Sequence, residues 1–586
     1  MRGSAVRVAG WWALLWCLLP ELLAGCGSSG FYGAVSGLIR QAPPAQQVYR
    51  YADVTTDIAS FDPGQATDQF SLEAITMVFT GLVQLDDQLQ VRPQLAQSYA
   101  VSPDGLTYTF HLRPHLKFSD GQPLSARDVA YSIDRALSPA IANLNGVTLT
   151  YLGQLKDAPA RVAGKVGTLI GDSLKVIDPQ TIQLLVSAPT PYFLQALTYP
   201  TSYVVEKKVI DAWQNRWTDH LSDNGGQGGA GPFRVQRYDH TTGIVFAPNP
   251  NYYGPLPRLR RVDFAFYKTS QAAFSAYQAD QADLAPVPPE QLARARALPY
   301  HQYIQTPVLT IDYIALNYLY RPFDNIHIRQ AFALAINKDV IARAIYDNVR
   351  VPTCHIIPQG MPGYTPSLRC PAGASTRGNA LKARALFQQG LREEKLTLAT
   401  FPPVKITYQS NVQALDNEIT SLRQEWKQVL GVNVTSQVLD FVPFLQAQAK
   451  TACTRSNLAQ CQNQGLQMWA AAWSADYPDP QDWITLQFAP NAPNNQTNYG
   501  QNLGRTARAQ QQTQATMLRA DRETNPRLRL AAYSRVEQQL VDQVAWLSMS
   551  QRNSSAVRKP YVIGLRLNAL ALTPPDDWGH IFIAAH

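Results

Sequence analysis

Acidic residues cluster in one otherwise aromatic and small-residue segment, Trp473-Ser-Ala-Asp-Tyr-Pro-Asp-Pro-Gln-Asp482. A carboxylate in such surroundings can neutralise a positive group, because an unpaired buried charge is very costly. Asp479 precedes Pro480 and has the context of a helix N-cap, and Asp482 then falls in the first helical turn. Asp476 has no such role, which leaves two alternatives for it: binding a cationic group of a ligand, or turn chemistry.

The six cysteines indicate disulfides rather than a metal site. They fall into an N-terminal set, Cys17 and Cys26, and two local pairs, Cys354 with Cys370 and Cys453 with Cys461. Local, even pairing is typical of disulfides in an oxidising compartment. Neither pair has CxxC spacing and the nearest histidine, His355, is isolated, so we expect no zinc site.

The sequence lacks the signatures of common enzyme classes. It has no HExxH, GxSxG or phosphate-binding GxxxxGK motif, and its nine histidines are scattered. Gly226, Gly228 and Gly231 match G-x-G-x-x-G, but that motif requires a helix directly after it, and residues 232–238 have a strand pattern. The net charge is +8, yet no run of five Lys or Arg residues supports nucleic-acid binding.

The first 25 residues have the pattern of an export signal. Arg2 and Arg7 precede an apolar stretch at 11–19, too short to span a bilayer, and Leu23-Ala-Gly-Cys26 follows. This tetrad resembles the bacterial lipobox, in which the cysteine becomes the lipid-modified first residue. We predict a signal peptide over 1–25, lipidation at Cys26, a flexible tether over 26–47 and an extracytoplasmic, membrane-anchored location. An ordinary cysteine within a cleaved signal is the alternative.

Past residue 48 the chain alternates between strand and helix patterns without a strict repeat, which is typical of α/β lobes. Its 586 residues are too many for a single core. Ser125 and Asp128 predict a capped helix start. Strands are expected at 106–113, 173–177, 181–186, 232–238, 262–267, 309–316, 404–410, 432–438, 466–473 and 544–550. Helices are expected at 72–85, 125–137, 325–336, 378–395, 413–430, 506–522 and 526–543, with a further helix starting at 337.

A series of short motifs runs in order along nearly the whole mature chain. Among them are Phe61-Asp-Pro63, Ser102-Pro-Asp-Gly-Leu-Thr-Tyr-Thr-Phe-His-Leu-Arg113, Lys117-Phe-Ser-Asp-Gly121, Asn249-Pro-Asn-Tyr-Tyr253, Arg329-Gln-Ala-Phe-Ala-Leu-Ala335 and Ala475-Asp-Tyr-Pro-Asp-Pro480. Each motif alone is weak, but their order is specific. On these residues the chain resembles the oligopeptide- and dipeptide-binding proteins of ABC importers, extracellular solute-binding protein family 5.

The resemblance implies an α/β fold of the type II periplasmic-binding-protein kind, with two lobes that close about a hinge. A third, small domain would be inserted in lobe one, and the chain would cross between the lobes twice. Lobe one is expected at 48–87, 173–305 and 549–586, the inserted domain at 88–172 and lobe two at 306–548. The ligand is expected between the lobes, where domain-interface clefts usually lie.

The resemblance also implies the residues that bind the ligand. In the family, the aspartate of the Ala-Asp-Tyr motif holds the peptide amine, and here this residue is Asp476. Trp473, Ser474 and Tyr477 would line the same wall, and Phe441 would lie over the ligand as an aromatic ring. Tyr313 and Asn317 would bond the peptide backbone by strand-like pairing. Thr67 would lie in the lobe-one loop that meets the peptide. Core packing is the alternative for Trp473 and Phe441.

Two positions depart from the family pattern. Ser550-Gln-Arg552 occupies the place of a cleft tyrosine near the C-terminal crossing, and Ala470 stands where some relatives place an arginine for the peptide carboxylate. Peptide length and side-chain preference therefore stay open, and Arg552 is a candidate partner for the ligand carboxylate.

Together these patterns predict a solute-binding lipoprotein, not an enzyme, that captures di- to oligopeptides. It would deliver them to the permease subunits of an ABC importer. We expect a monomer that needs no cofactor or metal ion and binds no nucleic acid. Two alternatives stay open: the same fold binding a nickel chelate, haem or an oligosaccharide, and a peptide receptor that serves signalling.

Overall fold

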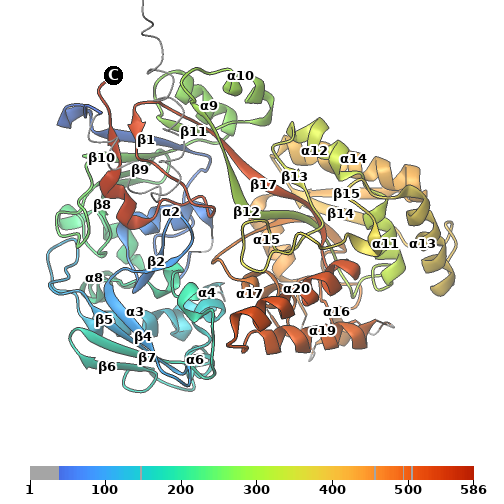
Figure 1. The fold of residues 1–586 in the computed structure, drawn as a ribbon, viewed down its shortest axis with the longest axis horizontal. Coiled ribbons are helices and arrows are strands. Elements are labelled where there is room, and N and C mark those ends of the chain that lie inside the picture. Colours follow the sequence, from blue (N-terminus) through green and yellow to red (C-terminus); the bar gives the residue numbers. More distant parts are fainter. Residues whose placement is uncertain are drawn as a thin grey trace, which may run out of the picture.

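The computed structural model describes residues 39–66, 68–145, 148–453, 457–492, 494–502, 504 and 506–586. Blue and green segments build most of one lobe, and yellow and orange segments build most of the other (Figure 1). Two long strands, β12 (Tyr303–Leu316) and β17 (Leu547–Arg558), run between the lobes (Figure 1). This arrangement confirms the two-lobed α/β fold expected from the sequence.

One large sheet extends through both lobes in the order β15-β14-β16-β12-β17-β11-β1-β10-β9-β8, and β13 (Val351–Pro352) pairs with β17 off this path. Its lobe-one strands are β1 (Val48–Asp53), β8 (Phe233–Asp239), β9 (Gly243–Pro248), β10 (Arg261–Phe266) and β11 (Leu284–Pro286). Its lobe-two strands are β14 (Val404–Gln409), β15 (Val434–Leu439) and β16 (Met468–Ser474).

The two crossing strands are antiparallel neighbours. Their pairing slips between Pro307 and Ile311 and again between Asp312 and Tyr313. Such irregularities bend strands locally, and we refer to this stretch, where both strands pass between the lobes, as the hinge.

A separate sheet, in the order β4-β5-β7-β6, forms the inserted small domain. Its strands are β4 (Ala96–Val101), β5 (Thr107–Leu112), β6 (Leu174–Asp178) and β7 (Thr181–Leu185). We expected this domain to end at residue 172, and that boundary is wrong. Ile182 pairs with Phe110 of β5, and both side chains are buried in the same core, so the domain continues through Leu185.

Helix starts are set by side chains that the sequence predicts. The Ser125 hydroxyl caps α3 (Ala126–Ala136), and the Ser125 N–H donates to the Asp128 carboxylate at 2.8 Å, which completes a capping box. In lobe two, Asn325 and Asn337 cap α11 (Ile326–Leu334) and α12 (Lys338–Tyr346). Helix α14 (Gln413–Leu430) has the predicted bounds and ends at Gly431, whose φ of 76° suits glycine.

Residues 41–47 are packed on lobe one, which corrects the tether expected over 26–47. The Gln47 side chain is 1% exposed and donates to the carbonyls of Ala42 and Ile583, each at 2.8 Å. Gln41 forms a bridge with Ala584. These contacts fix the segment to the C-terminal residues, so any tether ends before Gln41. Cys26 and the predicted signal at 1–25 lie outside the described residues.

Both predicted cysteine pairs are joined as disulfides, Cys354 to Cys370 and Cys453 to Cys461.

The glycine-rich loop at 224–231 leads into strand β8 rather than a helix, which confirms that its glycines do not form a dinucleotide motif. Across the part of the chain that the structure describes, no helix combines the length and apolar character needed to cross a bilayer.

Candidate ligand-binding site

A cavity of about 1570 Å³ lies between the lobes. Both lobes and both crossing strands contribute to its wall, including Tyr151 and Tyr199 from the lobe-one side and Trp473 from lobe two. Its charged lining residues are Asp57, Asp68, Lys268, Asp312, Arg350, Glu418, Asp476 and Arg552. The volume exceeds that of a typical small-molecule pocket, about 300–1000 Å³.

Asp476 follows the end of β16 and reaches the cavity wall, where it is partly exposed. Its carboxylate accepts a hydrogen bond of 2.6 Å from the Tyr151 hydroxyl. Tyr151 belongs to α5 (Thr148–Leu152), so this contact joins the inserted domain to lobe two. Burial raises the pKa of Asp476 to about 7, although the Tyr151 hydrogen bond opposes that shift. Among the described residues no cation pairs with this carboxylate.

A second carboxyl group lies directly behind Asp476. Asp482 is fully buried, and its Oδ2 accepts from the Asp476 backbone N–H at 3.2 Å and from the Trp473 indole N–H at 3.3 Å. Burial, and then the nearby charge of Asp476, raise the pKa of Asp482 well above its usual value. The two carboxyl groups therefore resist being ionised together, and a cation at Asp476 would relieve the repulsion.

Asp479 has the structural role expected from the sequence. It caps α17 (Pro480–Trp483) by accepting from the Gln481 N–H at 2.9 Å. It also accepts two hydrogen bonds from the buried Arg529 guanidinium, at 2.8 and 2.6 Å. Because these contacts occupy both oxygens, Asp479 has no free group for a ligand.

Four other predicted site residues line the cavity. Trp473 and Ser474 end β16, and the Ser474 hydroxyl lies 2.9 Å from that of Thr310. Tyr313 is 7% exposed and stacks on Trp546 with ring centroids 3.7 Å apart, so it presents little more than an edge. Phe441 opens α15 (Phe441–Ala449) and is 48% exposed, which makes core packing the wrong alternative for this residue.

Two predicted residues lie away from the cavity. Asn317 is fully buried, and its amide donates to the Leu466 carbonyl at 3.0 Å and accepts from the Leu319 N–H at 3.0 Å. Tyr477 is also fully buried, and its ring stacks on Tyr192. Both side chains are already committed within the protein, so we do not assign them to the ligand. Thr67 lies outside the described residues.

Arg552, which the sequence offered as a candidate partner for a ligand carboxylate, lines the cavity, but the sequence did not predict the ionic cluster that it joins at the hinge. Asp312 of β12 pairs with Arg350, and with Arg552 of β17 at 2.5 Å. Burial alone would raise the pKa of Asp312, but the two arginines lower it below its usual value. Nearby, burial raises the pKa of Glu418, which accepts a 2.5 Å hydrogen bond from Tyr346. Two arginines pair with the single carboxylate of Asp312, so the immediate surroundings of Asp312 can attract an anion.

An apolar patch completes the lobe-two wall. Val412, Phe441 and Leu445 are 37%, 48% and 45% exposed, respectively, and all three line the cavity. Phe441 and Leu445 lie one turn apart on α15, so their side chains share a face. Exposed apolar surface inside a cavity is typical of a site that binds apolar groups.

No set of three or more His, Cys, Asp or Glu residues within the described ranges is arranged to hold a metal ion.

These features define a two-lobed protein with a candidate ligand site in the cavity between its lobes. The family model for bacterial extracellular solute-binding proteins, family 5 (middle part), matches residues 90–495. The chain therefore belongs to the bacterial extracellular solute-binding proteins of family 5, which confirms the resemblance of its motifs.

Individual relatives cover most of the chain. The "Probable deoxycholate-binding periplasmic protein YgiS" of Escherichia coli is 26% identical over 551 residues, which are 92% of this chain and 94% of the relative. The oligopeptide-binding protein OppA of Bacillus subtilis is 25% identical over 455 residues, 76% of this chain and 78% of the relative. The structure of the murein tripeptide binding protein MppA of Escherichia coli matches with a TM-score of 0.75 at 21% identity, covering 92% of this chain and 99% of that chain.

Proposed function

We propose that this chain captures peptides outside the cytoplasm and delivers them to an ABC importer. The observation that carries the proposal is Asp476, a carboxylate at the wall of an interlobe cavity with no cationic partner among the described residues. A peptide's terminal ammonium supplies the charge that this group lacks. Relatives named as oligopeptide- and dipeptide-binding proteins support the same ligand class.

We propose that the terminal carboxylate of a peptide binds to arginines at the hinge. Arg350 and Arg552 line the cavity beside Asp312, and Arg552 keeps 42% of its side chain exposed. Strands β16 and β17 flank β12, so they lie about 10 Å apart. An extended chain rises about 3.3 Å per residue, so a peptide of about three residues would span from Asp476 to Arg552. Trp473, Ser474, Tyr313 and Phe441 would contact its backbone and side chains.

The location and partners follow from the N-terminal sequence and the family. We propose that the signal at 1–25 is cleaved and that Cys26 carries the lipid anchor on the outer side of the cell membrane. The protein would act as a monomer and present its closed, loaded form to the permease subunits. In this role it binds and releases its ligand without chemical change, so we propose no enzymatic activity.

Native mass spectrometry of the purified protein tests this proposal. We expect co-purified masses that match short peptides, and titration calorimetry should then show one peptide per chain. Binding should be lost when the peptide amine is acetylated. A protein that binds acetylated and free peptides equally well would contradict the role of Asp476, and one that binds no peptide at all would contradict the proposed function.

A second candidate ligand is an amphipathic organic acid. The apolar patch of Val412, Phe441 and Leu445 and the arginine pair suit an apolar body with a carboxylate, and one relative carries the name of a deoxycholate binder. Such a ligand leaves Asp476 without a cation, which favours the peptide. Competition between deoxycholate and a tripeptide for the same protein distinguishes the two.

A further inference from the structure

A buried lysine lies beside one of the two disulfides. Lys338 is the first residue of α12 and is 6% exposed. Its ammonium nitrogen donates to the Thr353 carbonyl at 2.9 Å and lies 3.4 Å from the Sγ of Cys354. The lysine is therefore held in direct contact with one sulfur of the Cys354–Cys370 disulfide.

No carboxylate in the described ranges pairs with Lys338. The neighbouring Asp339 pairs with Arg377 at 3.3 Å. Glu537, beyond Cys354, receives the N–H groups of Ile356 and Ile357 and contacts His355. Burial accordingly lowers the pKa of Lys338 to about 7, although Asp339 offsets part of that shift. Near neutral pH, Lys338 can therefore donate its proton to a base or, while it keeps that proton, pair with an anion.

The two sulfurs of this disulfide differ in access. Cys354 is 7% exposed, whereas Cys370 is partly exposed. A thiolate from solvent reaches the more exposed sulfur first, and the other sulfur then leaves with the electron pair. The leaving sulfur is thus the one that Lys338 contacts. A leaving group departs faster when its thiolate is stabilised, and a nearby lysine stabilises a thiolate.

We propose that Cys370 is a site of reversible modification by low-molecular-weight thiols, with Cys354 as the leaving sulfur and Lys338 as the group that neutralises it. The attacking thiol loses its proton to solvent, and its sulfur bonds to Cys370 Sγ. The Cys354–Cys370 bond breaks, and its electron pair stays on Cys354, which Lys338 pairs with or protonates. A second thiol then releases Cys370, which leaves the dithiol form of the protein and the small disulfide.

The surrounding fold tolerates this opening. The loop that the disulfide closes is also held by Glu537 of α20 (Pro526–Asp542), whose carboxylate accepts from Ile356 N–H at 3.0 Å. It is held again by Gln551 of β17, which accepts from the Gln359 N–H at 2.8 Å and donates to the Gln359 carbonyl at 3.0 Å. These bonds keep the loop in place when the disulfide opens, so the two thiols stay close enough for the small disulfide to oxidise them back by the reverse exchange.

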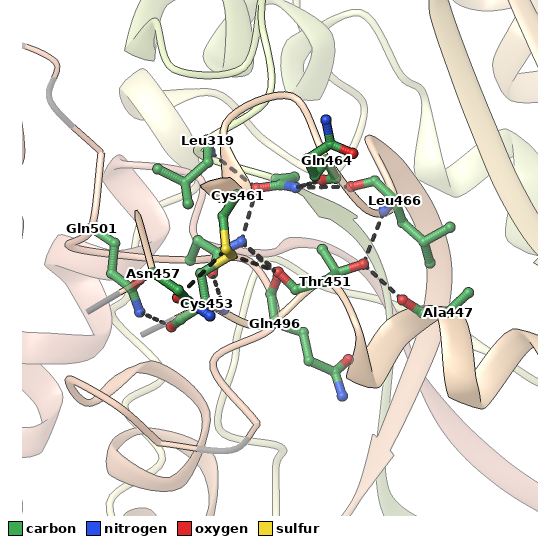
Figure 2. The surroundings of a disulfide bond; sticks show 12 residues. Leu319, Ala447, Thr451, Cys453, Asn457, Cys461, Gln464, Leu466, Gln496 and Gln501 are labelled. Carbon is green, nitrogen blue, oxygen red and sulfur yellow. Dashed lines mark hydrogen bonds between the residues drawn. A yellow bond between two sulfur atoms is a disulfide. The ribbon is translucent and has the colours of Figure 1, made fainter. Parts of the chain in front are cut away.

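The chain contains a matched disulfide for comparison. Cys453 is 6% exposed and Cys461 partly exposed, so this pair has the same difference in access. Figure 2 shows the described contacts of its two sulfurs, and both contacts are to neutral groups: the Cys453 sulfur contacts the Thr451 carbonyl at 3.4 Å, and the Cys461 sulfur contacts the Asn457 side chain at 3.6 Å. Among the described residues, no lysine or arginine bonds to either of these two sulfurs.

Timed exposure of the full chain to reduced glutathione at pH 7, followed by mass spectrometry of peptides, tests the proposal. We expect the Cys354–Cys370 disulfide to open about tenfold faster than Cys453–Cys461, because a lysine stabilises its leaving thiolate. The glutathione adduct should lie on Cys370. Lys338→Met should remove the rate difference and leave Cys453–Cys461 unchanged. Equal rates in the wild type, or an adduct on Cys354, would overturn the proposal.

A second variant covers the case in which Lys338→Met does not fold. In Cys370→Ser the lysine is intact and Cys354 is a free thiol. The pH dependence of its reaction with iodoacetamide should give a thiol pKa below the ordinary value of about 8.5. A value at or above 8.5 would overturn the role of Lys338. Neither experiment uses the ligand cavity, so both outcomes are independent of the proposed peptide binding.

Discussion

The Asp476→Asn substitution should separate the charge of Asp476 from its size and position. Asparagine keeps an oxygen that can accept the Tyr151 hydrogen bond, which is 2.6 Å long in the wild type. It also leaves the Asp476 N–H free to donate to Asp482. The substitution therefore removes the negative charge at the cavity wall while preserving the loop that carries it.

The expected loss follows from the isolation of this carboxylate. No cation of the described residues pairs with Asp476, so the ligand ammonium would be the cation that this carboxylate lacks. Truncating one partner of a buried, hydrogen-bonded charge pair costs about 2–5 kcal/mol. Because about 1.4 kcal/mol corresponds to a tenfold change, the Kd for a free peptide should rise about 30-fold to 5000-fold.

Titration calorimetry at pH 7.5 with a free tripeptide and its N-acetylated form provides the assay. Wild type should prefer the free peptide strongly, and Asp476→Asn should bind both forms with similar, weak affinity. Asp57→Asn is the matched control, because Asp57 lines the same cavity but already contacts His240 at 2.8 Å. We expect this control to change the Kd little. Equal weakening of both peptides by Asp476→Asn would refute the ammonium contact.

Four further predictions concern the charged groups. Because burial raises the pKa of Asp476 to about 7, peptide affinity should rise about 50-fold from pH 5 to pH 7, a range in which the peptide amine stays mostly protonated. Calorimetry should show this rise in the wild type and not in Asp476→Asn. Because its pKa is raised in the native state, Asp476 takes up a proton on folding between about pH 4 and pH 7. The free energy of unfolding of the unliganded protein should therefore fall as the pH rises through this range, and Asp476→Asn should raise the Tm at pH 8. Arg552→Gln should weaken free-acid peptides about 10- to 150-fold and leave amidated peptides unaffected. Arg529→Met, which leaves buried Asp479 unpaired, should cost about 3–5 kcal/mol in urea unfolding without changing the peptide Kd.

Each of these results has an outcome that would contradict it, and for the stability prediction that outcome is an unchanged Tm of Asp476→Asn at pH 8. A pH-independent affinity would mean that Asp476 is ionised throughout or remote from the ligand. An amidated peptide weakened as much as the free acid would remove the carboxylate from Arg552. A stable Arg529→Met variant would show that the buried pair with Asp479 contributes little to lobe two.

Elements with a local sequence signal were predictable. The capping pair of Ser125 and Asp128, the N-cap Asn337 and the bounds of α14 all depend on residues a few positions apart. The position of Asp476 at the cavity also came from reasoning along the chain, since Asp479 and Asp482 had structural roles to fill. Such predictions succeed because backbone geometry links neighbours in sequence directly.

What failed depended on contacts between distant segments. The β6–β7 hairpin has the same pattern whether it joins the large sheet or the small one, and only its pairing with β5 decides this. Asn317 lies four residues after Tyr313, but β12 ends at Leu316, so the amide turns toward Leu466 instead of the ligand. Arg350 and Arg552 meet at Asp312 from separate elements, and the one local hint was an acid within an apolar strand.

Without a ligand, the carboxylates of Asp476 and Asp482 repel each other, and a bound ammonium can reduce that repulsion. Asp482 is fixed by the Trp473 indole and the Asp476 N–H, and this directs the neighbouring Asp476 carboxylate into the cavity although both acids resist ionising together. The Tyr151 hydroxyl of the inserted domain donates a hydrogen bond to the same carboxylate at 2.6 Å. A bound ammonium and the closing lobe would therefore meet on one group. Since a ligand shifts a conformational equilibrium only through its different affinity for the two states, this shared carboxylate gives ligand charge a direct means to favour closure.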